Sequence, residues 1–266
     1  MQKAAVTENY PWLEHNIAED APIPDEHVGR PIQHLGDRQT EYNRYIEGCL
    51  KFYGDKGNAC LRSEADRVHM SLRQPASMKN YTDIGFRKIR APDDLMDMLY
   101  SFWETNKDNE SNEKWFTGNS YTNHWESPTT MVSVEDKTLA GGGFELKQRI
   151  WDAARGALEE WTGQELKESS LYGIRIYKED AILATHVDRM PLISSCIINV
   201  AQDVDEDWPI EVIGHDGRAH NITMEPGDMV LYESHSVLHG MFVELFSKVC
   251  IWILQRRLVG IVTYIC

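Results

Sequence analysis

The residues of this chain that are best suited to bind a metal ion are two histidines and one aspartate. His186 and Asp188 are two positions apart in an apolar run that predicts a strand, so their side chains point to the same face of it. His239 follows a later predicted strand, beyond a Pro-Gly-Asp turn at residues 226–228. Two imidazoles and one carboxylate leave neighbouring coordination positions open, an arrangement typical of non-haem iron(II) oxygenases.

Other histidines offer alternative interpretations of this pattern. The chain contains 10 histidines, and His215, His220 and His235 lie in the same half of the chain as the motif. Each is also compatible with an ordinary surface or hydrogen-bonded core histidine. His235 competes directly with His239 as the third ligand, because both belong to the sequence HSVLH.

Short strands and helices are the elements that must position these side chains. From about residue 170, β-rich runs alternate with turn sequences such as DRMP and EPGD. Two amphipathic helices are expected before them, one starting at Ala91-Pro92 and one running from the glycines at 141–143 to a cap at Gly163. The pattern predicts an α+β fold in which a double-stranded β-helix (jelly roll) is braced by N-terminal helices.

The expected domain organisation has two parts. Residues 1–90 are polar and rich in turn residues, and they predict an irregular arm with one short helix around Glu41 to Phe52. Residues 91–266 form the predicted helix-braced jelly-roll domain, with its strand core at about 170–258.

The composition limits the classes of partner. A formal net charge of -15 argues against a nucleic-acid partner, because phosphate binding needs basic surface. Neither a signal peptide nor a transmembrane segment is evident, so we expect a soluble protein with no membrane partner and leave its compartment open. Cys49 and Cys60 bracket a short loop and are compatible with a disulfide or with two free thiols.

Long stretches of the chain resemble the prolyl-4-hydroxylase-like proteins of the iron(II)- and 2-oxoglutarate-dependent dioxygenase superfamily. They lie between Cys49 and Gly240 and read QPASMKNYTDIGFRKIRAP, GNSYTNHWESPTTMVSVED, LYGIRIYKEDAILATHVDRMPLISSCIINVAQDVDEDWPIEV and GHDGRAHNITMEPGDMVLYESHSVLHG. The resemblance implies an enzyme that uses Fe(II), 2-oxoglutarate and O2, with ascorbate as reductant. It also implies that the enzyme hydroxylates a C–H bond of a peptide or protein substrate and releases succinate and CO2. By analogy with the family, the hydroxylated residue would be a proline.

The same resemblance assigns roles to individual residues. His186 and Asp188 match the family's HxD motif, and His239 matches its distal iron histidine, which directly precedes a glycine as it does here. Tyr177 matches a tyrosine that hydrogen-bonds the 2-oxoglutarate carboxylate, although an ordinary core aromatic is the alternative. Lys248 is the best-placed basic partner for the far carboxylate of the cosubstrate, with Arg256 and Arg257 behind it.

The chain departs from the family pattern after Gly240. Its sequence there reads MFVELFSKVCIWILQRRLVGIVTYIC, where relatives continue HG with Arg-Pro and an aromatic and acidic strand. This departure puts in question both the Lys248 anchor and the closure of the jelly roll by its last strand. Two alternatives follow: an inactive jelly-roll binding protein that has lost its 2-oxoglutarate anchor, and a cupin-like metal protein without a 2-oxo acid.

Other residues near the motif have open interpretations. The cluster of Tyr121, His124 and Trp125 is compatible with a peptide groove or with packing. Arg189 follows the HxD motif and is compatible with a substrate contact or with a surface ion pair. The sequence does not identify the hydroxylated residue or the oligomeric state.

Overall fold

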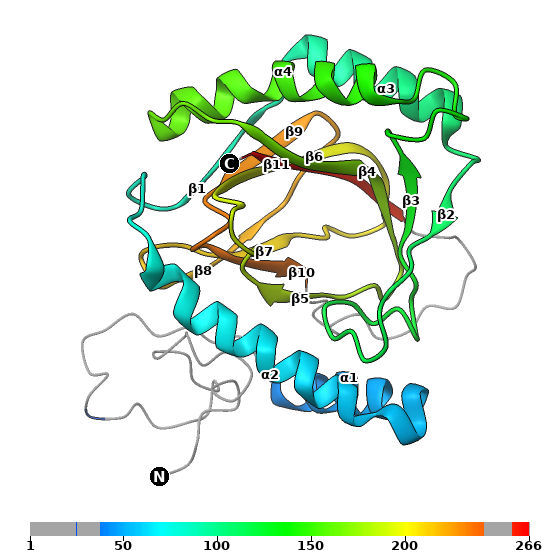
Figure 1. The fold of residues 1–266 in the computed structure, drawn as a ribbon, viewed down its shortest axis with the longest axis vertical. Helices are drawn as coiled ribbons and strands as arrows, with labels where there is room; N and C mark the ends of the chain where they lie inside the picture. Colours follow the sequence, from blue (N-terminus) through cyan, green and yellow to red (C-terminus); the bar gives the residue numbers. More distant parts are fainter. Residues whose placement is uncertain (1–24, 26–37, 242–256, 266) are drawn as a thin grey trace.

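The structure is a computed structural model that describes residues 25, 38–241 and 257–265 (Figure 1). Its helices are α1 (Arg38–Tyr53), α2 (Asn58–Arg73), α3 (Asp93–Asn106) and α4 (Phe144–Thr162), with short 3-10 helices η2 (Gly54–Lys56) and η3 (Gln74–Ser77). Its strands are β1 (Phe86–Arg90), β2 (Ser111–Asn112), β3 (Thr130–Ser133), β4 (Glu168–Lys178), β5 (Leu183–His186), β6 (Ser194–Asp203), β7 (Ile210–Ile213), β8 (Ala219–Ile222), β9 (Asp228–Tyr232), β10 (Leu238–Met241) and β11 (Arg257–Ile265).

The strands form two antiparallel sheets. The larger has seven strands in the order β1-β9-β6-β11-β4-β3-β2, and the smaller has four in the order β5-β10-β7-β8. Figure 1 shows the sheets facing one another, with α3 and α4 across the larger sheet and α1 and α2 beside the smaller one. The chain therefore has the mixed helix and antiparallel-sheet architecture that its sequence predicted.

Helices α3 and α4 pack on the outer face of the larger sheet because each buries one apolar stripe. Leu95 and Leu99 of α3 and Ile150 and Leu158 of α4 are fully buried against strand residues that include Ile174. The spacing of these residues matches one face of a helix, as expected from the sequence. α4 begins after the three glycines and ends where Gly163 adopts φ 64°, the left-handed cap predicted for it.

A second apolar cluster fills the space between the two sheets. Tyr177, Val230 and Tyr232 contribute from the larger sheet, and Leu183 and Val212 contribute from the smaller one. Side chains along β4 alternate between the two faces of the sheet: Ile174 and Ile176 belong to the helix-covered core, whereas Tyr177 points to the inner cluster. The candidate metal site lies on the smaller sheet beside this inner cluster.

The N-terminal region differs from the irregular arm predicted for residues 1–90. Helix α1 covers the expected Glu41–Phe52 segment, but α2 and strand β1 were not predicted. β1 pairs with β9 along its whole length and so belongs to the larger sheet. The apolar periodicity failed to reveal α2 because its buried face carries Glu64, Arg67 and Ser71.

A disulfide joins α1 to α2. Cys49 and Cys60 are bonded and fully buried, which is one of the two alternatives that their spacing left open. The bridge ties the two helices into a hairpin beside the smaller sheet.

The last strand lies further along the chain than predicted. β11 spans Arg257–Ile265, beyond the expected end of the strand core near residue 258, and its backbone pairs with both β4 and β6. The larger sheet is therefore continuous across this position. The segment at 242–256, with Lys248 and Arg256, lies outside the described residues.

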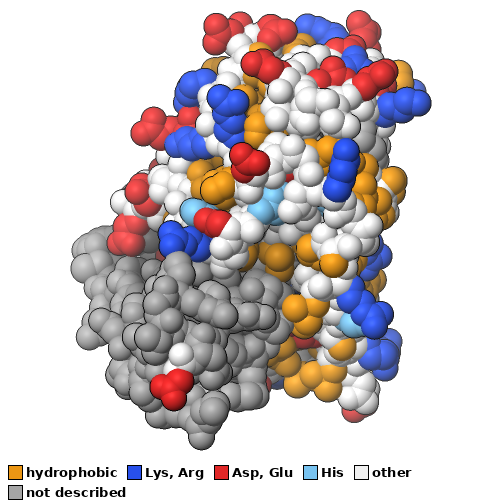
Figure 2. All heavy atoms as spheres, turned by 90° about the vertical axis from the view of Figure 1, so that its left-hand side faces the viewer, with side chains coloured by type: hydrophobic (Ala, Val, Ile, Leu, Met, Phe, Trp, Pro, Cys, Tyr) orange, Lys and Arg blue, Asp and Glu red, His pale blue; other side chains and the backbone are white. Residues whose placement is uncertain are grey.

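The described surface is chemically mixed. Figure 2 shows acidic and basic side chains interspersed at the top of one face, around the α3 and α4 layer, with apolar side chains between them. Within the described part of the chain, no helix has the length and apolar character needed to cross a membrane.

Candidate metal centre

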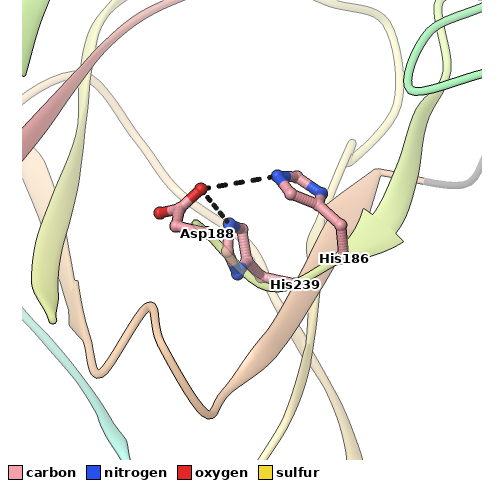
Figure 3. Close-up of side chains that lie close together, drawn as sticks. All are labelled: His186, Asp188 and His239. Atoms are coloured by element: carbon pink, nitrogen blue, oxygen red, sulfur yellow. Dashed lines mark ion pairs between the residues drawn. The ribbon is translucent and has the colours of Figure 1, made fainter. Parts of the chain in front are cut away.

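The structure brings His186, Asp188 and His239 together. One ligand atom from each lies within 4.8 Å of the others, and all three residues are buried. Figure 3 shows both imidazoles facing the Asp188 carboxylate. His186 Nε2 lies 3.6 Å and His239 Nε2 lies 3.8 Å from the same oxygen, Oδ1.

The pairing of β5 with β10 sets this geometry. His186 ends β5, and His239 is its direct partner across the antiparallel ladder. Directly opposed side chains point to the same face, and here the two ring centroids are 4.5 Å apart. Asp188 lies just beyond the strand, where its backbone N–H donates to the carbonyl of Ser234 at 2.8 Å.

Gly240 allows the two ligand strands to approach closely. A Cβ atom at this position would lie 2.7 Å from the carbonyl oxygen of Leu183 and 2.8 Å from Cα of Thr185, both on β5. These contacts involve backbone atoms and cannot be relieved by a side-chain rotation. The glycine that follows His239 therefore has a steric role in the site.

The ring orientation of both histidines is fixed by backbone carbonyls. His186 Nδ1 lies 2.8 Å from the carbonyl of Ala184, and His239 Nδ1 lies 2.9 Å from that of Val237. Because a carbonyl only accepts, Nδ1–H donates and the Nε2 lone pair faces Asp188. This is the tautomer and the supporting contact that metal-binding histidines usually have.

Burial keeps His239 neutral. It lowers the pKa of His239 to about 4, with a further lowering by nearby His186 that outweighs the opposing effect of Asp188. A neutral imidazole offers its lone pair without first losing a proton. The site is therefore prepared for a cation at neutral pH.

Two serines support the carboxylate. Ser195 Oγ lies 3.5 Å from Asp188 Oδ2, the oxygen that faces away from the histidines, and 2.7 Å from Ser234 Oγ. All three side chains are buried. Oδ1 is thereby directed toward the imidazoles.

The donor set fits a first-row divalent metal. Two ligands at right angles, with bonds of about 2.1 Å, are about 3 Å apart. Each histidine–carboxylate separation of 3.6 or 3.8 Å therefore needs to close by less than about 1 Å. Two neutral imidazoles and one carboxylate on one side of an ion are the donor set of non-haem iron(II) oxygenases.

The structure distinguishes His239 from the competing histidines. His235 is fully buried in the turn before β10, where its Nδ1 lies 3.0 Å from the carbonyl of Ile193. His215 contacts Thr82 and Ser236, and His220 contacts Asp216. Within the described residues, only His239 joins His186 and Asp188 in a metal-sized group.

Of the two residues expected to contact the cosubstrate, the structure describes Tyr177 but not Lys248. Tyr177 is buried on the inner face of β4, and its hydroxyl lies 3.4 Å from Arg175 Nη1. Burial raises the pKa of Tyr177, so its hydroxyl keeps the proton it would donate. Lys248 lies outside the described residues. Its predicted contact with the cosubstrate therefore stays a prediction.

Arg175 is a basic residue that the sequence analysis missed. Alternation along β4 places it on the same inner face as Tyr177. Its guanidinium pairs with Glu113 at 2.7 Å and lies over the ring of Trp115. An arginine in a strand has no local signal that distinguishes an inward side chain from a solvent-facing one.

The aromatic cluster predicted beside the site is divided between two environments. The Tyr121 ring packs edge-on against His186, with the ring centroids 5.3 Å apart, so it contacts one of the three candidate ligands. His124 Nε2 lies 2.9 Å from the hydroxyl of Tyr53 on α1. The Trp125 ring packs at a tilted angle against Tyr45, which is also on α1. Packing accounts for His124 and Trp125.

Comparisons with known proteins found matches among solved structures. No protein-family model matches the sequence, and no curated protein matches it. Among solved structures, a prolyl-4-hydroxylase from Pseudomonas putida is similar over 74% of this chain and 97% of its own, with TM-score 0.47 and 12% identity. A prolyl hydroxylase from Trichoplax adhaerens, in complex with a hypoxia inducible factor peptide fragment, is similar over 75% and 90%, with TM-score 0.45 and 8% identity.

A third similar structure has a different activity. The non-heme alpha ketoglutarate dependent epimerase SnoN from nogalamycin biosynthesis is similar over 73% of this chain and 81% of its own, with TM-score 0.45 and 11% identity. The solved structures that are similar to this chain therefore include two prolyl hydroxylases and an alpha ketoglutarate dependent enzyme of another activity.

Proposed function

We propose that this protein is an Fe(II)- and 2-oxoglutarate-dependent dioxygenase that hydroxylates a C–H bond, with a peptidyl proline as its substrate. His186, Asp188 and His239 would hold the iron. Bound there, Fe(II) would supply the redox centre at which 2-oxoglutarate and O2 react. Ascorbate would serve as the reductant.

The observation that carries this proposal is the convergence of the three ligand atoms within 4.8 Å. Each histidine has its Nδ1 hydrogen on a backbone carbonyl, so that both Nε2 atoms are available. A structural zinc site would require a fourth protein ligand, and the described residues provide three. An open three-ligand site favours chemistry at a metal over a structural role.

The order of the strands supports a double-stranded β-helix as the scaffold. Strands β5, β10, β7 and β8 form one sheet, while β4, β11, β6 and β9 are consecutive in the other. From β4 to β11, successive strands therefore alternate between the two facing sheets, except that β7 and β8 pair with each other in the smaller one. In such a fold the two ligand strands lie side by side in the smaller sheet, and the inner cluster separates them from the larger one.

The reaction requires the protein to orient a dicarboxylate and exclude water. One oxygen atom of O2 would go to succinate as CO2 is released, and the other would become the new hydroxyl group, so 2-oxoglutarate would supply two of the four electrons that reduce O2 and the substrate C–H bond the other two. Tyr177 would donate a hydrogen bond to the cosubstrate carboxylate, which its buried and protonated hydroxyl permits. Lys248 would pair with the far carboxylate.

Arg175 is a second candidate for that pairing. It is mostly buried, lies beside Tyr177 and has the forked donor geometry that suits a carboxylate. Its side chain already pairs with Glu113. A dicarboxylate at Arg175 would have to replace Glu113 or share the guanidinium with it.

This ion pair favours the second candidate function, a binding protein that has lost its 2-oxoglutarate anchor. Glu113 also accepts a hydrogen bond from Thr129, so the carboxylate is held in place. If Glu113 stays on Arg175 and Lys248 does not reach the site, neither of these two candidate anchors is available to the cosubstrate. The alternative predicts metal binding without a response to 2-oxoglutarate.

A titration of 2-oxoglutarate into the anaerobic Fe(II) protein distinguishes these functions. An oxygenase should develop a metal-to-ligand charge-transfer absorption, and on admission of O2 it should form succinate with a proline-rich peptide. Asp188→Ala should abolish both signals. Asp216→Ala, which removes a carboxylate from a loop outside the site, should leave them unchanged.

The negative results are also informative. Wild-type protein that is folded and iron-loaded but shows neither signal contradicts the oxygenase function. Absorption without turnover across a panel of peptides would leave the cosubstrate site in place and reject the proline substrate.

A further inference from the structure

Helix α2 presents an unusually polar face to the ligand strand β5. Its buried residues are Cys60, Glu64, Arg67 and Ser71, a spacing that places them on one side of the helix. Arg67 pairs with Glu64 through two contacts, Nε to Oε2 at 2.9 Å and Nη2 to Oε1 at 2.5 Å. A buried ion pair adds little stability compared with apolar packing, so its presence beside the site needs another explanation.

The third guanidinium nitrogen of Arg67 contacts the segment that carries His186 and Asp188. Its Nη1 donates to the carbonyl of Thr185, the residue directly before His186. Glu64 fixes the other edge of the guanidinium, so the direction of this third hydrogen bond is set. Arg67 thus connects helix α2 to the N-terminal side of the HxD motif.

Gln74 makes the equivalent contact on the other side of the motif. It is the first residue of η3, directly after α2, and its Nε2 donates to the carbonyl of Asp188. The same amide lies 3.0 Å from the carbonyl of His235, in the turn that leads into β10. One side chain therefore links the segment of His186 and Asp188 to the turn that precedes His239.

These contacts matter because β5 is at the edge of the smaller sheet. Among the described residues, β10 is its one neighbour in that sheet, the other edge has an isolated bridge from Leu183 to Thr122, and Asp188 lies beyond the last residue paired with β10. Backbone carbonyls on a free strand edge need other donors. Helix α2 and η3 provide donors at Thr185, directly before His186, and at Asp188 itself.

We propose that Arg67 and Gln74 are positioning residues that hold the His186–Asp188 backbone in the conformation required to bind the metal. The proposal rests on the metal-binding function proposed above. It predicts that their removal changes the metal site before it changes the global fold. A purely structural role predicts a loss of stability with metal affinity unaltered in the folded protein.

The test uses the full chain with Gln74→Met, which keeps the length of the side chain and removes both hydrogen bonds. Gln148→Met is the matched control, because this residue is on α4, across the molecule from α2, and its amide contacts Asp152 of α4 and Glu168 of β4. A second variant, Glu64→Met with Arg67→Met, removes both members of the ion pair and so leaves no buried charge behind. Thermal unfolding of the metal-free proteins verifies that each variant is folded.

Two readouts are measured for each variant. In the metal-free protein, hydrogen exchange of peptides covering residues 183–190 should become about tenfold faster in both site variants and stay unchanged in the control. With Co2+ as the probe, the dissociation constant should rise about tenfold, because loss of contacts behind the ligands typically costs 10–100-fold in metal affinity. The Co2+ absorption bands should also change in shape, since they report the ligand geometry.

The two readouts separate the failure of each proposal. Wild-type protein that binds no Co2+ would contradict the metal function, and the exchange measurement would then decide the positioning role alone. Site variants that are folded and match the wild type in exchange at 183–190 would overturn the positioning role. Faster exchange with unchanged Co2+ affinity and spectrum would overturn it as well.

Discussion

Acidification of the metal-free protein should destabilise it through His239. Burial lowers the pKa of this residue to about 4 in the folded chain, whereas a histidine in the unfolded chain has its ordinary pKa of about 6.5. Between these values the unfolded state binds a proton that the folded state does not. Stability is therefore lost as the pH falls from about 6.5 to about 4, and the loss is complete below that range.

The size of this effect follows from the difference between the two pKa values. A difference of about 2.5 units, at about 1.4 kcal/mol per unit, gives a loss of about 3 kcal/mol. This is a large fraction of the total stability of a typical domain, which is about 5–15 kcal/mol. His239 alone should therefore make the metal-free protein acid-sensitive.

Urea unfolding at a series of pH values measures this contribution. The protein is freed of metal with a chelator. The wild type is then compared with His239→Gln, which has no titratable side chain at position 239. His69→Gln, at an exposed position on α2, is the matched control. Between about pH 7 and pH 4, the free energy of unfolding of the wild type should fall by about 3 kcal/mol more than that of His239→Gln. Other acid-sensitive groups cancel in this comparison.

One result would refute the reasoning. If wild type and His239→Gln lose stability in parallel across this range while His69→Gln matches both, His239 does not stay neutral in the folded protein. This result would refute a neutral His239 that is buried and donates its Nδ1 hydrogen to the carbonyl of Val237.

Three further predictions follow from the described contacts. Cys49→Ser opens the disulfide to Cys60 and should lower the free energy of unfolding by roughly 3 kcal/mol in non-reducing buffer, with no difference from wild type once both are reduced. Gly240→Ala should cost about 1–3 kcal/mol in urea unfolding and weaken Co2+ binding, because the new methyl group meets the β5 backbone. Arg67→Met should cost about 3–5 kcal/mol because it leaves Glu64 charged and buried, whereas replacing both residues by methionine should be close to neutral by the same measurement.

The ligand motif was recognisable in the sequence because its chemistry is local. His186 and Asp188 are close enough along the chain for a strand or its extension to direct both side chains to one side. The apolar periods of α3 and α4 were equally readable, since a core-facing helix repeats its apolar residues at fixed spacing.

Helix α2 was missed for the opposite reason. Its buried face is polar, and no periodicity rule distinguishes an arginine that meets a strand carbonyl from one that faces water. Arg175 escaped notice in the same way, because its burial depends on Glu113 and Trp115, which are distant in sequence.

By itself, the sequence determined the residue types of the candidate ligands and the order of helices and strands from α3 onward. It also identified the glycine that directly follows His239. Only the tertiary structure decided that His239 and not His235 faces the other two ligands, because the register between β5 and β10 sets which side chains are opposed. That register depends on pairing between segments far apart in the chain, and local residue preferences do not specify it.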